Sequence, residues 1–280
     1  MKGKICLITG ATSGIGKVTA LELARMGATV VISGRNPQRC ADTVAFIRTA
    51  TGNAAVEQLV ADLSSQAEIR RMAAEFKQRF PRLDVLVNNA GGFFMKREIT
   101  VDGFEMTWAL NHLSYFLLTH LLLDTLKASA PARIVNVSSD AHQGGRINFQ
   151  DLQGERNYRG WFAYAQSKLA NILFTYELAH KLDGSSITVN ALHPGFVASG
   201  FAKNNGSLVR LGISILGLFA LTPEQGAQTS VYLASSPEVE GVTGKYYMKC
   251  KPANSSPASY DMDTARQLWD VSEKMVGIVN

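Results

Sequence analysis

The sequence predicts an α/β protein with one mainly parallel sheet that is covered by helices on both faces. Short segments rich in β-branched residues alternate along the chain with longer segments that have helical hydrophobic spacing. The strand-like segments are too apolar to leave one face in water, which is typical of parallel strands buried on both sides. No Pro, Gly or Ser linker, repeat or low-complexity tract divides the chain. We therefore expect one domain over residues 1–280.

The individual elements follow one another in a regular order. Each expected strand except the last is followed by a helix, which predicts a doubly wound, seven-stranded sheet. The tail, from about 250 to 280, is expected to form a loop and a terminal helix. The expected strands span 4–9, 29–33, 56–61, 84–88, 133–138, 187–193 and 244–248, and the expected helices span 16–26, 38–50, 65–80, 104–126, 164–182 and 223–234.

Composition restricts the class of protein. The 280 residues are 46% hydrophobic and 18% charged, as in ordinary globular proteins. The net charge of +5 comes from dispersed basic residues, which argues against a nucleic-acid partner. Cys6, Cys40 and Cys250 have neither metal-type nor disulfide-type spacing, so we expect no metal and a reducing, cytoplasmic location. We expect no signal peptide, since the sequence goes straight into a strand-like run, and no apolar run reaches the roughly 20 residues of a membrane span.

A glycine-rich turn separates the first strand from the first helix. The stretch LITGATSGIG contains Gly10, Gly14 and Gly16. Glycine permits a tight turn and a close backbone approach, and the free N–H groups at a helix N-terminus attract a pyrophosphate. Turns also use glycine for purely steric reasons. The position directly after a strand and at the start of a helix favours a dinucleotide site.

The end of the second strand, VVISGRN, favours NADP over NAD. An acid near this point would bind the ribose 2′-hydroxyl of NAD, whereas Arg35 suits the 2′-phosphate of NADP. Lys17, beside the glycine turn, is a second candidate for a phosphate contact. Arg35 as an ordinary surface cation, and therefore NAD, stays open as the alternative. Asp62, after the third strand, is either an adenine contact or a helix N-cap, a role for which Ser64 is an equal candidate.

Two polar residues, Tyr164 and Lys168, interrupt the mainly apolar helical stretch AYAQSKLANILF. Tyr164 and Lys168 are four residues apart, so they lie on one helix face, one turn from each other. A free tyrosine has a pKa of about 10, and a nearby ammonium stabilises the phenolate and lowers that pKa. The pair is therefore either a surface pair or an acid–base catalyst with a tuned pKa.

The ordered set of motifs resembles the short-chain dehydrogenase/reductase family. The motifs are TGATSGIG, NNAG at 88–91, VSS ending at Ser139, YAQSK, and HPG at 193–195. The block INFQDLQGERNYRGWFAYAQSKLANILFTYELAHKL and the long stretch between Ser139 and Tyr164 resemble the retinol-dehydrogenase-like branch. The resemblance covers nearly the whole chain. It implies a Rossmann-type domain that transfers a hydride to or from a nicotinamide cofactor.

The resemblance also implies roles for individual residues. Tyr164 would be the general acid/base, Lys168 would lower its pKa and hold the nicotinamide ribose, and Ser139 would donate to the carbonyl oxygen. Ser139 is chosen over Ser138 because the family's catalytic serine aligns with the second of the pair. Asn111 would distort its helix and support a water-mediated proton relay through the lysine. The implied cofactor-binding residues are Gly10, Thr12, Ser13, Gly14, Ile15, Gly16, Arg35, Asp62, Leu63, Asn89, Ala90, Gly91, Tyr164, Lys168, Pro194, Gly195, Val197 and Ser199.

The apolar stretch NNGSLVRLGISILGLFAL falls where the family places its substrate lid, at about 200–222. Its character favours a small lipophilic substrate, an aldehyde, ketone or alcohol, and NADPH as donor favours reduction. Peripheral membrane contact through 208–221 and burial of that stretch as a helix or oligomer contact both stay open. The candidates for the walls of the substrate pocket are Phe93, Phe94, Met95, Trp161 and Phe162.

Two other functions stay open. One is an NAD-dependent secondary-alcohol dehydrogenase. The other is a non-catalytic, cofactor-sensing protein, which would be expected to lose Tyr164 or Lys168, and both are present. The resemblance further implies a homo-oligomer formed through the long helices.

Overall fold

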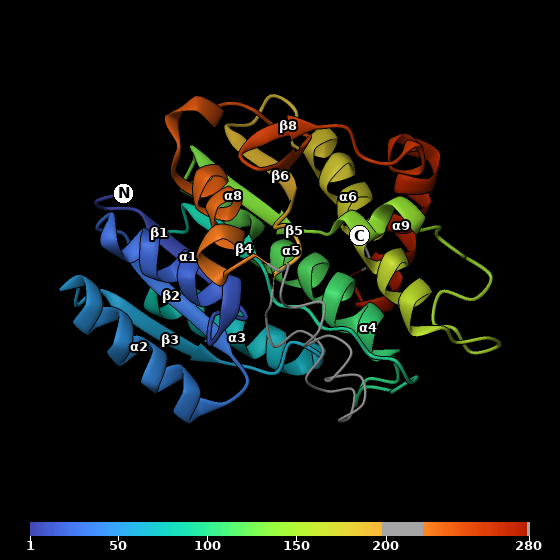
Figure 1. The fold of residues 1–280 in the computed structure, drawn as a ribbon, viewed down its shortest axis with the longest axis horizontal. Helices are drawn as coiled ribbons and strands as arrows, with labels where there is room; N and C mark the ends of the chain where they lie inside the picture. Colours follow the sequence, from blue (N-terminus) through green and yellow to red (C-terminus); the bar gives the residue numbers. More distant parts are fainter. Residues whose placement is uncertain (198–220, 279–280) are drawn as a thin grey trace.

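The computed structural model of the protein describes residues 1–197 and 221–278 (Figure 1). Its centre is one sheet with the strand order β3-β2-β1-β4-β5-β6-β7-β8. All neighbouring strands of this sheet pair in parallel except β7 and β8. The predicted α/β fold with a mainly parallel sheet is confirmed. The strands are β1 Ile5–Thr9, β2 Thr29–Gly34, β3 Val56–Val60, β4 Val85–Asn88, β5 Ala132–Val137, β6 Ile187–His193, β7 Lys245–Met248 and β8 Lys251–Ala253.

Within residues 1–197 and 221–278, the sheet has eight strands rather than the seven expected. The additional strand is β8, at a place where a loop was expected, and it pairs antiparallel with β7. The turn between them consists of Lys249 and Cys250, with φ angles of 49° and 59°. Two-residue hairpins with both central residues in the left-handed region usually carry Asn or Gly there. Because neither residue is present, the turn has no sequence signal.

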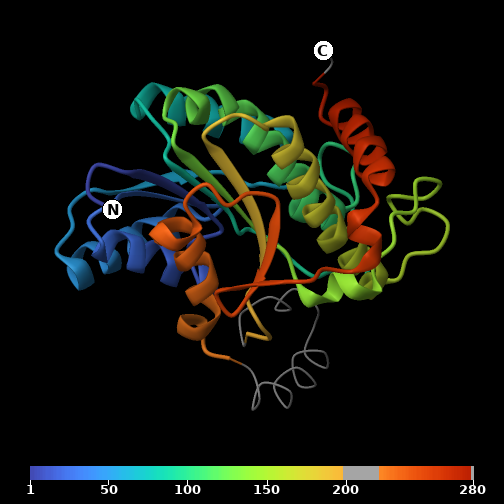
Figure 2. The ribbon, with the colours of Figure 1, turned by 90° about the horizontal axis from the view of Figure 1, so that it is seen from above.

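Helices cover both faces of the sheet (Figure 2). α1, α2 and α8 lie on one face, α3, α5 and α6 lie on the other, and α9 packs outside the second layer. Adjacent residues of β1 point to opposite faces of the sheet. Leu7 packs in the hydrophobic core beneath α3 and α5, and Ile8 packs in the core beneath α1 and α2. The helices are α1 Gly14–Arg25, α2 Pro37–Thr51, α3 Gln66–Arg79, α4 Met106–Trp108, α5 Ser114–Ala128, α6 Gly160–Lys181, α8 Pro223–Ser235 and α9 Met262–Met275.

The helix expected at 104–126 is interrupted near its start. α4 passes into a π-helical turn, Ala109–Leu113, before α5 begins. The turn contains Asn111, at which the family resemblance implies a distortion. Short π turns inside helices are rare and often lie at functional sites.

The order of the strands positions a ligand site. From β1 the chain runs outward through β2 to β3 and then returns to β4 on the other side of β1. Loops that follow β1 and β4 therefore diverge, and a crevice forms at the carboxyl ends of the strands.

The tail expected from about residue 250, here called the C-terminal extension, contains the expected helix, α9. This helix packs on α5 and α6. The ring of Trp269 lies 5.9 Å from the ring of Phe174 and 4.9 Å from the ring of Phe116. α9 therefore covers part of the outer face of these two long helices.

None of the described helices is long and apolar enough to cross a membrane. Apart from Leu221 and Thr222, the lid expected at 200–222 lies outside the described residues.

Candidate active site

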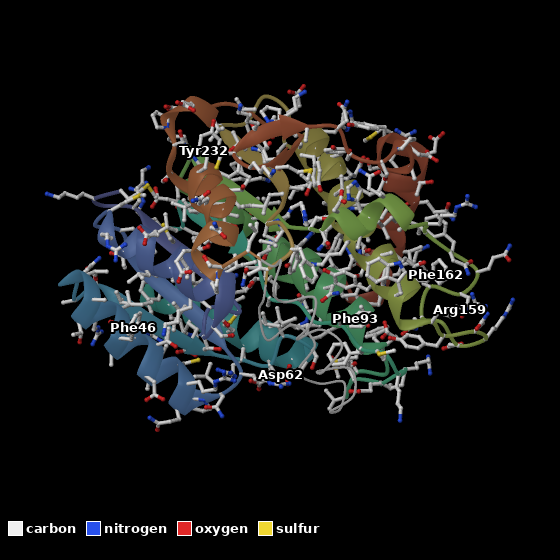
Figure 3. The ribbon with its side chains drawn as sticks, in the orientation of Figure 1. Phe46, Asp62, Phe93, Arg159, Phe162 and Tyr232 are labelled. Atoms are coloured by element: carbon white, nitrogen blue, oxygen red, sulfur yellow. The ribbon has the colours of Figure 1, made fainter. Side chains whose placement is uncertain are left out.

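A cleft of about 1030 Å³ opens at the carboxyl edge of the sheet. Its lining comes from the loops after β1 to β6 and from the first part of α6. Figure 3 labels Asp62, which follows β3, and Phe93, which follows β4, on this edge of the molecule. The volume reaches the upper end of the roughly 300–1,000 Å³ typical of ligand sites, so the cleft has room for a large cofactor.

The glycine turn after β1 packs closely against the loop after β4. Gly10 has a φ of 64°, and a Cβ on it would lie 2.8 Å from Cα of Ala90. A Cβ on Gly16 would lie 2.5 Å from Nδ2 of Asn89, which donates to the carbonyl of Thr9 at 2.7 Å. A larger residue at either glycine would push the two loops apart. The glycines therefore keep this side of the cleft narrow and close to backbone N–H groups.

Helix α1 begins at the cleft without a side-chain cap. Its N-cap residue, Ser13, makes no side-chain hydrogen bond to the first turn, whereas Ser65 caps α3 by accepting from the N–H of Glu68. Unpaired N–H groups and the positive end of the helix dipole attract phosphate. Ser13, Gly14 and Ile15 line the cleft. This end of the cleft therefore fits a pyrophosphate.

Two arginines line the cleft beyond the end of β2. Arg35, expected there, is joined by Arg39 from the first turn of α2. The sequence analysis missed Arg39, although its position four residues after Arg35 at the start of a helix was a usable signal. Lys17 does not line the cleft, because its Nζ lies 3.7 Å from the ring centroid of Phe46. The phosphate contact considered for Lys17 is therefore not supported.

Asp62 lines the cleft but caps no helix. Its Oδ1 accepts from the N–H of Ser64 at 2.9 Å and from the Ser64 hydroxyl at 2.7 Å. The N-cap of α3 is Ser65, so the cap role considered for Asp62 and Ser64 is wrong. Asp62 and Leu63 both line the cleft, next to the loop that carries Arg35.

The two serines after β5 have different roles in the structure. Ser138 is buried, and its hydroxyl donates to the backbone carbonyl of Lys168 at 2.7 Å, which ties β5 to α6. The hydroxyl oxygen of Ser139 accepts from the N–H of Ala141 at 3.2 Å and is hydrogen-bonded to the phenol of Tyr164. A hydroxyl has one hydrogen, and the Ala141 contact does not use it. Ser139 can therefore donate to Tyr164 or to a substrate oxygen.

Tyr164 lines the cleft and is almost completely buried. The rings of Phe93 and Trp161 lie 5.8 Å and 6.2 Å from its ring. Burial raises the pKa of Tyr164 to about 12, and the hydrogen bond with Ser139 acts in the opposite direction. This shift is opposite to the lowering expected from Lys168. The groups of the protein hold Tyr164 as a phenol at neutral pH, which is the form that donates a proton.

Lys168 is buried beside Tyr164. Its Nζ donates to the carbonyl of Val137 at 3.0 Å and lies 5.7 Å from the ring centroid of Tyr164. Burial lowers the pKa of Lys168 to about 7, because the ammonium loses its water. Burial therefore favours the uncharged amine of Lys168 over the ammonium. For the phenol of Tyr164, its own loss of water on burial is the largest influence on the pKa, and Lys168 does not reverse it.

The amide of Asn111 is buried, and both its oxygen and its nitrogen are hydrogen-bonded. Its Oδ1 accepts from the N–H of Gly92 at 2.8 Å, and its Nδ2 donates to Gly92 O and to Ser167 Oγ at 3.0 Å each. Asn111 does not itself line the cleft. It joins the π turn to the loop after β4, next to Gly91, where an added Cβ would lie 3.1 Å from Asn111 Oδ1 and 3.6 Å from Lys168 Nζ.

The loop after β6 forms a further wall. Pro194, Gly195 and Val197 line the cleft, as expected. Val197 forms a parallel β-bridge with Leu221, so these two residues lie side by side at the cleft wall. Ser199, the remaining expected cofactor contact, lies outside the described residues.

Beyond Tyr164 the cleft is mainly apolar. Of the expected wall residues, Phe94 and Trp161 line it, and Phe93 packs against Tyr164. Phe162 does not line the cleft, and its ring lies 5.8 Å from the guanidinium of Arg159 (Figure 3). Met95 does not line the cleft either. The lining residues that the sequence analysis missed at this end are Glu98, Met106, Leu110 and Phe196.

The structure brings most of the expected residues into one cleft. Ser139, Tyr164 and Lys168 line it together, and Asn111 lies behind its wall. The expected cofactor-binding residues that line it are Gly10, Thr12, Ser13, Gly14, Ile15, Gly16, Arg35, Asp62, Leu63, Asn89, Ala90, Gly91, Tyr164, Lys168, Pro194, Gly195 and Val197.

The chain is similar in sequence to known oxidoreductases. A family model for short chain dehydrogenases matches residues 4–208. Retinol dehydrogenase 14 of Homo sapiens is 47% identical over 299 residues, which cover 100% of this chain and 88% of that protein. Retinol dehydrogenase 13 of Homo sapiens is 45% identical over 283 residues, covering 99% of this chain and 85% of that protein.

Solved structures share the fold. A crystal structure of an uncharacterised protein from Mycobacterium paratuberculosis has a TM-score of 0.80 and 35% identity, and covers 99% of this chain and 94% of that one. Pseudomonas aeruginosa RhlG, solved as an active-site complex with NADP, has a TM-score of 0.71 and 32% identity, and covers 88% and 94% of the two chains. The motifs, the cleft and these relatives agree: the chain belongs to the short chain dehydrogenase family, in its retinol-dehydrogenase-like branch, and is an oxidoreductase that acts on CH–OH or carbonyl groups with an NAD(P) cofactor.

Proposed function

We propose that the chain uses NADP(H) to interconvert a small lipophilic aldehyde or ketone and the corresponding alcohol. One observation carries this proposal: Ser139, Tyr164 and Lys168 meet in a single cleft that has a glycine turn at one end and an apolar lining at the other. The first end suits a dinucleotide, and the second suits an apolar substrate.

The choice of NADP rests on the guanidinium groups of Arg35 and Arg39. Each presents a planar set of N–H donors that matches a phosphate, and both line the cleft after β2. Residues 34–39 include no acid that would take the ribose 2′-hydroxyl of NAD. The similar structure of RhlG is an NADP complex, which supports the same choice. NAD-dependent oxidation of a secondary alcohol is the alternative.

The proton chemistry is assigned to the groups around Tyr164. The bound cofactor supplies the hydride. Tyr164, held as a phenol by burial, donates its proton to the substrate oxygen, and Ser139 donates a hydrogen bond to the same oxygen as negative charge develops. Lys168 has three N–H donors as an ammonium, of which one serves Val137, so it can also bind ribose hydroxyls and stabilise the phenolate. Asn111 holds the π turn beside Lys168 and supports the return of the proton through water.

The substrate class rests on the apolar end of the cleft. Phe94, Met106, Leu110 and Trp161 line the cleft with Tyr164, as does Glu98, and the ring of Trp161 lies 6.2 Å from that of Tyr164. The relatives that share 45–47% of the sequence are named retinol dehydrogenases, and these names point to a lipophilic alcohol or aldehyde. A retinal-sized aldehyde is therefore the first substrate to test.

The experiment is a cofactor-by-substrate matrix. Purified protein is mixed with NADPH or NADH and with aldehydes and ketones of increasing size and apolarity, and the loss of reduced-cofactor absorbance is followed. We expect faster turnover with NADPH and a kcat/KM that rises with apolarity. A preference for NADH would overturn the cofactor assignment. Cofactor binding without turnover on any substrate would favour the cofactor-sensing alternative.

Other features of the protein are also proposals. We propose one catalytic domain over 1–280, with a substrate lid at about 200–222. We further propose a cytoplasmic enzyme, with peripheral membrane contact and homo-oligomerisation through its long helices. Light scattering after size exclusion measures the oligomer, and co-sedimentation with anionic lipid vesicles measures the membrane contact.

A further inference from the structure

The peptide between Ser139 and Asp140 is held by two imidazoles. Its carbonyl, on Ser139, accepts from Nδ1 of His142 at 2.7 Å and from the backbone N–H of His142 at 3.1 Å. Its N–H, on Asp140, donates to Nδ1 of His193 at 3.1 Å. Both polar ends of this peptide are therefore fixed. The orientation of a peptide determines where the preceding Cα and its side chain lie, so the peptide positions the hydroxyl of Ser139.

The tautomer of His142 follows from its second partner. Nε2 of His142 accepts from the backbone N–H of Ser256 at 2.9 Å. A backbone amide can only donate, so Nε2 carries a lone pair and the single ring proton is on Nδ1. The ring is completely buried, and burial lowers the pKa of His142, in the same direction as the neutral form that the two contacts require. Nδ1–H therefore donates to Ser139, and no alternative tautomer satisfies both contacts.

The position of Ser256 is fixed by hydrogen bonds of its neighbours, one of which reaches α6, the helix that carries Tyr164 and Lys168. The neighbouring Ser255 has its hydroxyl 2.8 Å from the phenol oxygen of Tyr176 on α6, and its N–H donates to Tyr260 at 3.1 Å. The hydroxyl of Ser259 donates to the carbonyl of Ser256. The C-terminal extension thus presents one backbone N–H, at a fixed place, to the far side of the His142 ring.

From these contacts we propose that His142 is a positioning residue. Its Nδ1–H bonds the backbone carbonyl of Ser139 and so aims the Ser139 hydroxyl at the reacting oxygen and at Tyr164, while its Nε2 ties the ring to the C-terminal extension at Ser256. The inference rests on the proposed role of Ser139. His142 contacts neither the cleft nor the phenol and acts only through Ser139.

Two substitutions separate the two ring nitrogens. His142→Gln can place an acceptor at the position of Nε2 and keep the Ser256 contact, but it removes the donor to Ser139. His142→Asn keeps an N–H donor at the position of Nδ1 and loses the acceptor for Ser256. We expect His142→Gln to lower kcat about tenfold, which corresponds to the loss of one hydrogen bond in the transition state, with KM for cofactor unchanged. His142→Asn is expected to keep kcat within about threefold while reducing thermal stability.

Coupling to Ser139 distinguishes positioning from general damage. In a Ser139→Ala background, His142→Gln is expected to cause no further loss of kcat, because the hydroxyl that it positions is absent. Tyr246→Phe is the matched control: its ring centroid lies 5.0 Å from that of His142, and its buried hydroxyl has no hydrogen-bond partner among the described residues. This control is expected to leave kcat unchanged.

All rates are divided by the number of cofactor-binding sites, which are titrated by fluorescence, so that a partly unfolded variant still reports kcat per folded molecule. Equal losses from His142→Gln with and without the Ser139 hydroxyl would overturn the inference, and so would an unchanged kcat in His142→Gln. If Ser139→Ala alone keeps the activity of the natural chain, the assigned role of Ser139 fails, and the inference fails with it. A loss in Ser139→Ala without a loss in His142→Gln leaves the proposed function standing and refutes only the role of His142.

Discussion

The hydroxyl of Ser138 donates to the backbone carbonyl of Lys168 at 2.7 Å, so the strand that ends at the cleft is bonded to the helix that carries the catalytic candidates. The adjacent Ser139 faces Tyr164 instead. Neighbouring residues of an extended chain point to opposite sides, which lets one serine join the elements and the other serve the site. This division of roles can be tested one serine at a time.

The first prediction compares the two serines. Ser138→Ala removes one buried hydrogen bond and is expected to lower the free energy of unfolding by about 1 kcal/mol, with a change in kcat of less than about fivefold. Ser139→Ala removes the donor to the developing oxyanion and is expected to lower kcat by about 10²–10³ with little change in stability. Urea unfolding and steady-state rates measure both. The assignment is wrong if Ser138→Ala causes the large loss of kcat and Ser139→Ala causes the loss of stability.

The second prediction concerns the proton donor. Tyr164→Phe keeps the ring that packs against Phe93 and Trp161 but removes the phenol oxygen. We expect kcat to fall by roughly 10²–10⁴, while the dissociation constant of the cofactor changes little. Rates come from absorbance and binding from fluorescence. Undiminished turnover with intact cofactor binding would remove Tyr164 from the mechanism.

The third prediction concerns cofactor choice. Arg35→Ala and Arg39→Ala each remove a charged donor from the cleft, so each is expected to lower kcat/KM for NADPH by about 10- to 100-fold and to leave the value for NADH nearly unchanged. Lys17→Ala is the matched control, since its ammonium lies over the ring of Phe46. A loss in the control as large as in the arginine variants would show that any nearby positive charge suffices.

The fourth prediction is a dependence of stability on pH. The pKa of Lys168 is about 7 in the folded chain and about 10.4 in an unfolded one. Between these values the unfolded state binds more protons, so the contribution of Lys168 to the free energy of unfolding increases as pH rises from about 7 to about 10. We expect the stability of the natural chain relative to Lys168→Met to increase between pH 7 and pH 9. Urea unfolding of both proteins at the two pH values tests this, and parallel pH curves would contradict it.

The fifth prediction concerns the substrate wall. A Cβ on Gly160, at the start of α6, would lie 2.5 Å from the carbonyl of Phe94 and 2.8 Å from Cα of Met95. Gly160→Ala is therefore expected to displace this wall and to change KM for a retinal-sized substrate several-fold, without changing KM for the cofactor. Gly144→Ala is the control, since an added Cβ there meets nothing within 4 Å. Equal effects of the two variants on substrate KM would exclude a specific role for the contact at Gly160.

Much of the fold follows from local patterns in the sequence. Apolar β-branched segments alternate with helical ones because each element must bury a face, and the strand that ends at Thr9 and the helix that starts at Gly14 lie close to where the patterns predict them. β8 was missed because Lys249 and Cys250 adopt left-handed angles without the usual turn residues.

The side-chain directions could not be read from local patterns. Lys17 follows the glycine turn in sequence, but its ammonium lies over Phe46 of α2. The phenol of Tyr164 has a raised pKa because packing removes its water, although Lys168 lies one turn away. In both cases tertiary neighbours outweigh spacing along the chain.

By itself the sequence determined the alternating α/β order, the glycine turn after the first strand and the four-residue spacing of Tyr164 and Lys168, because these are properties of neighbouring residues. Only the tertiary structure decided that the ammonium of Lys17 lies over the ring of Phe46 and that His142 bonds Ser256, which lies 114 positions away in the chain. Contacts of this kind arise when separate elements pack, and the sequence has no local periodicity that reports them.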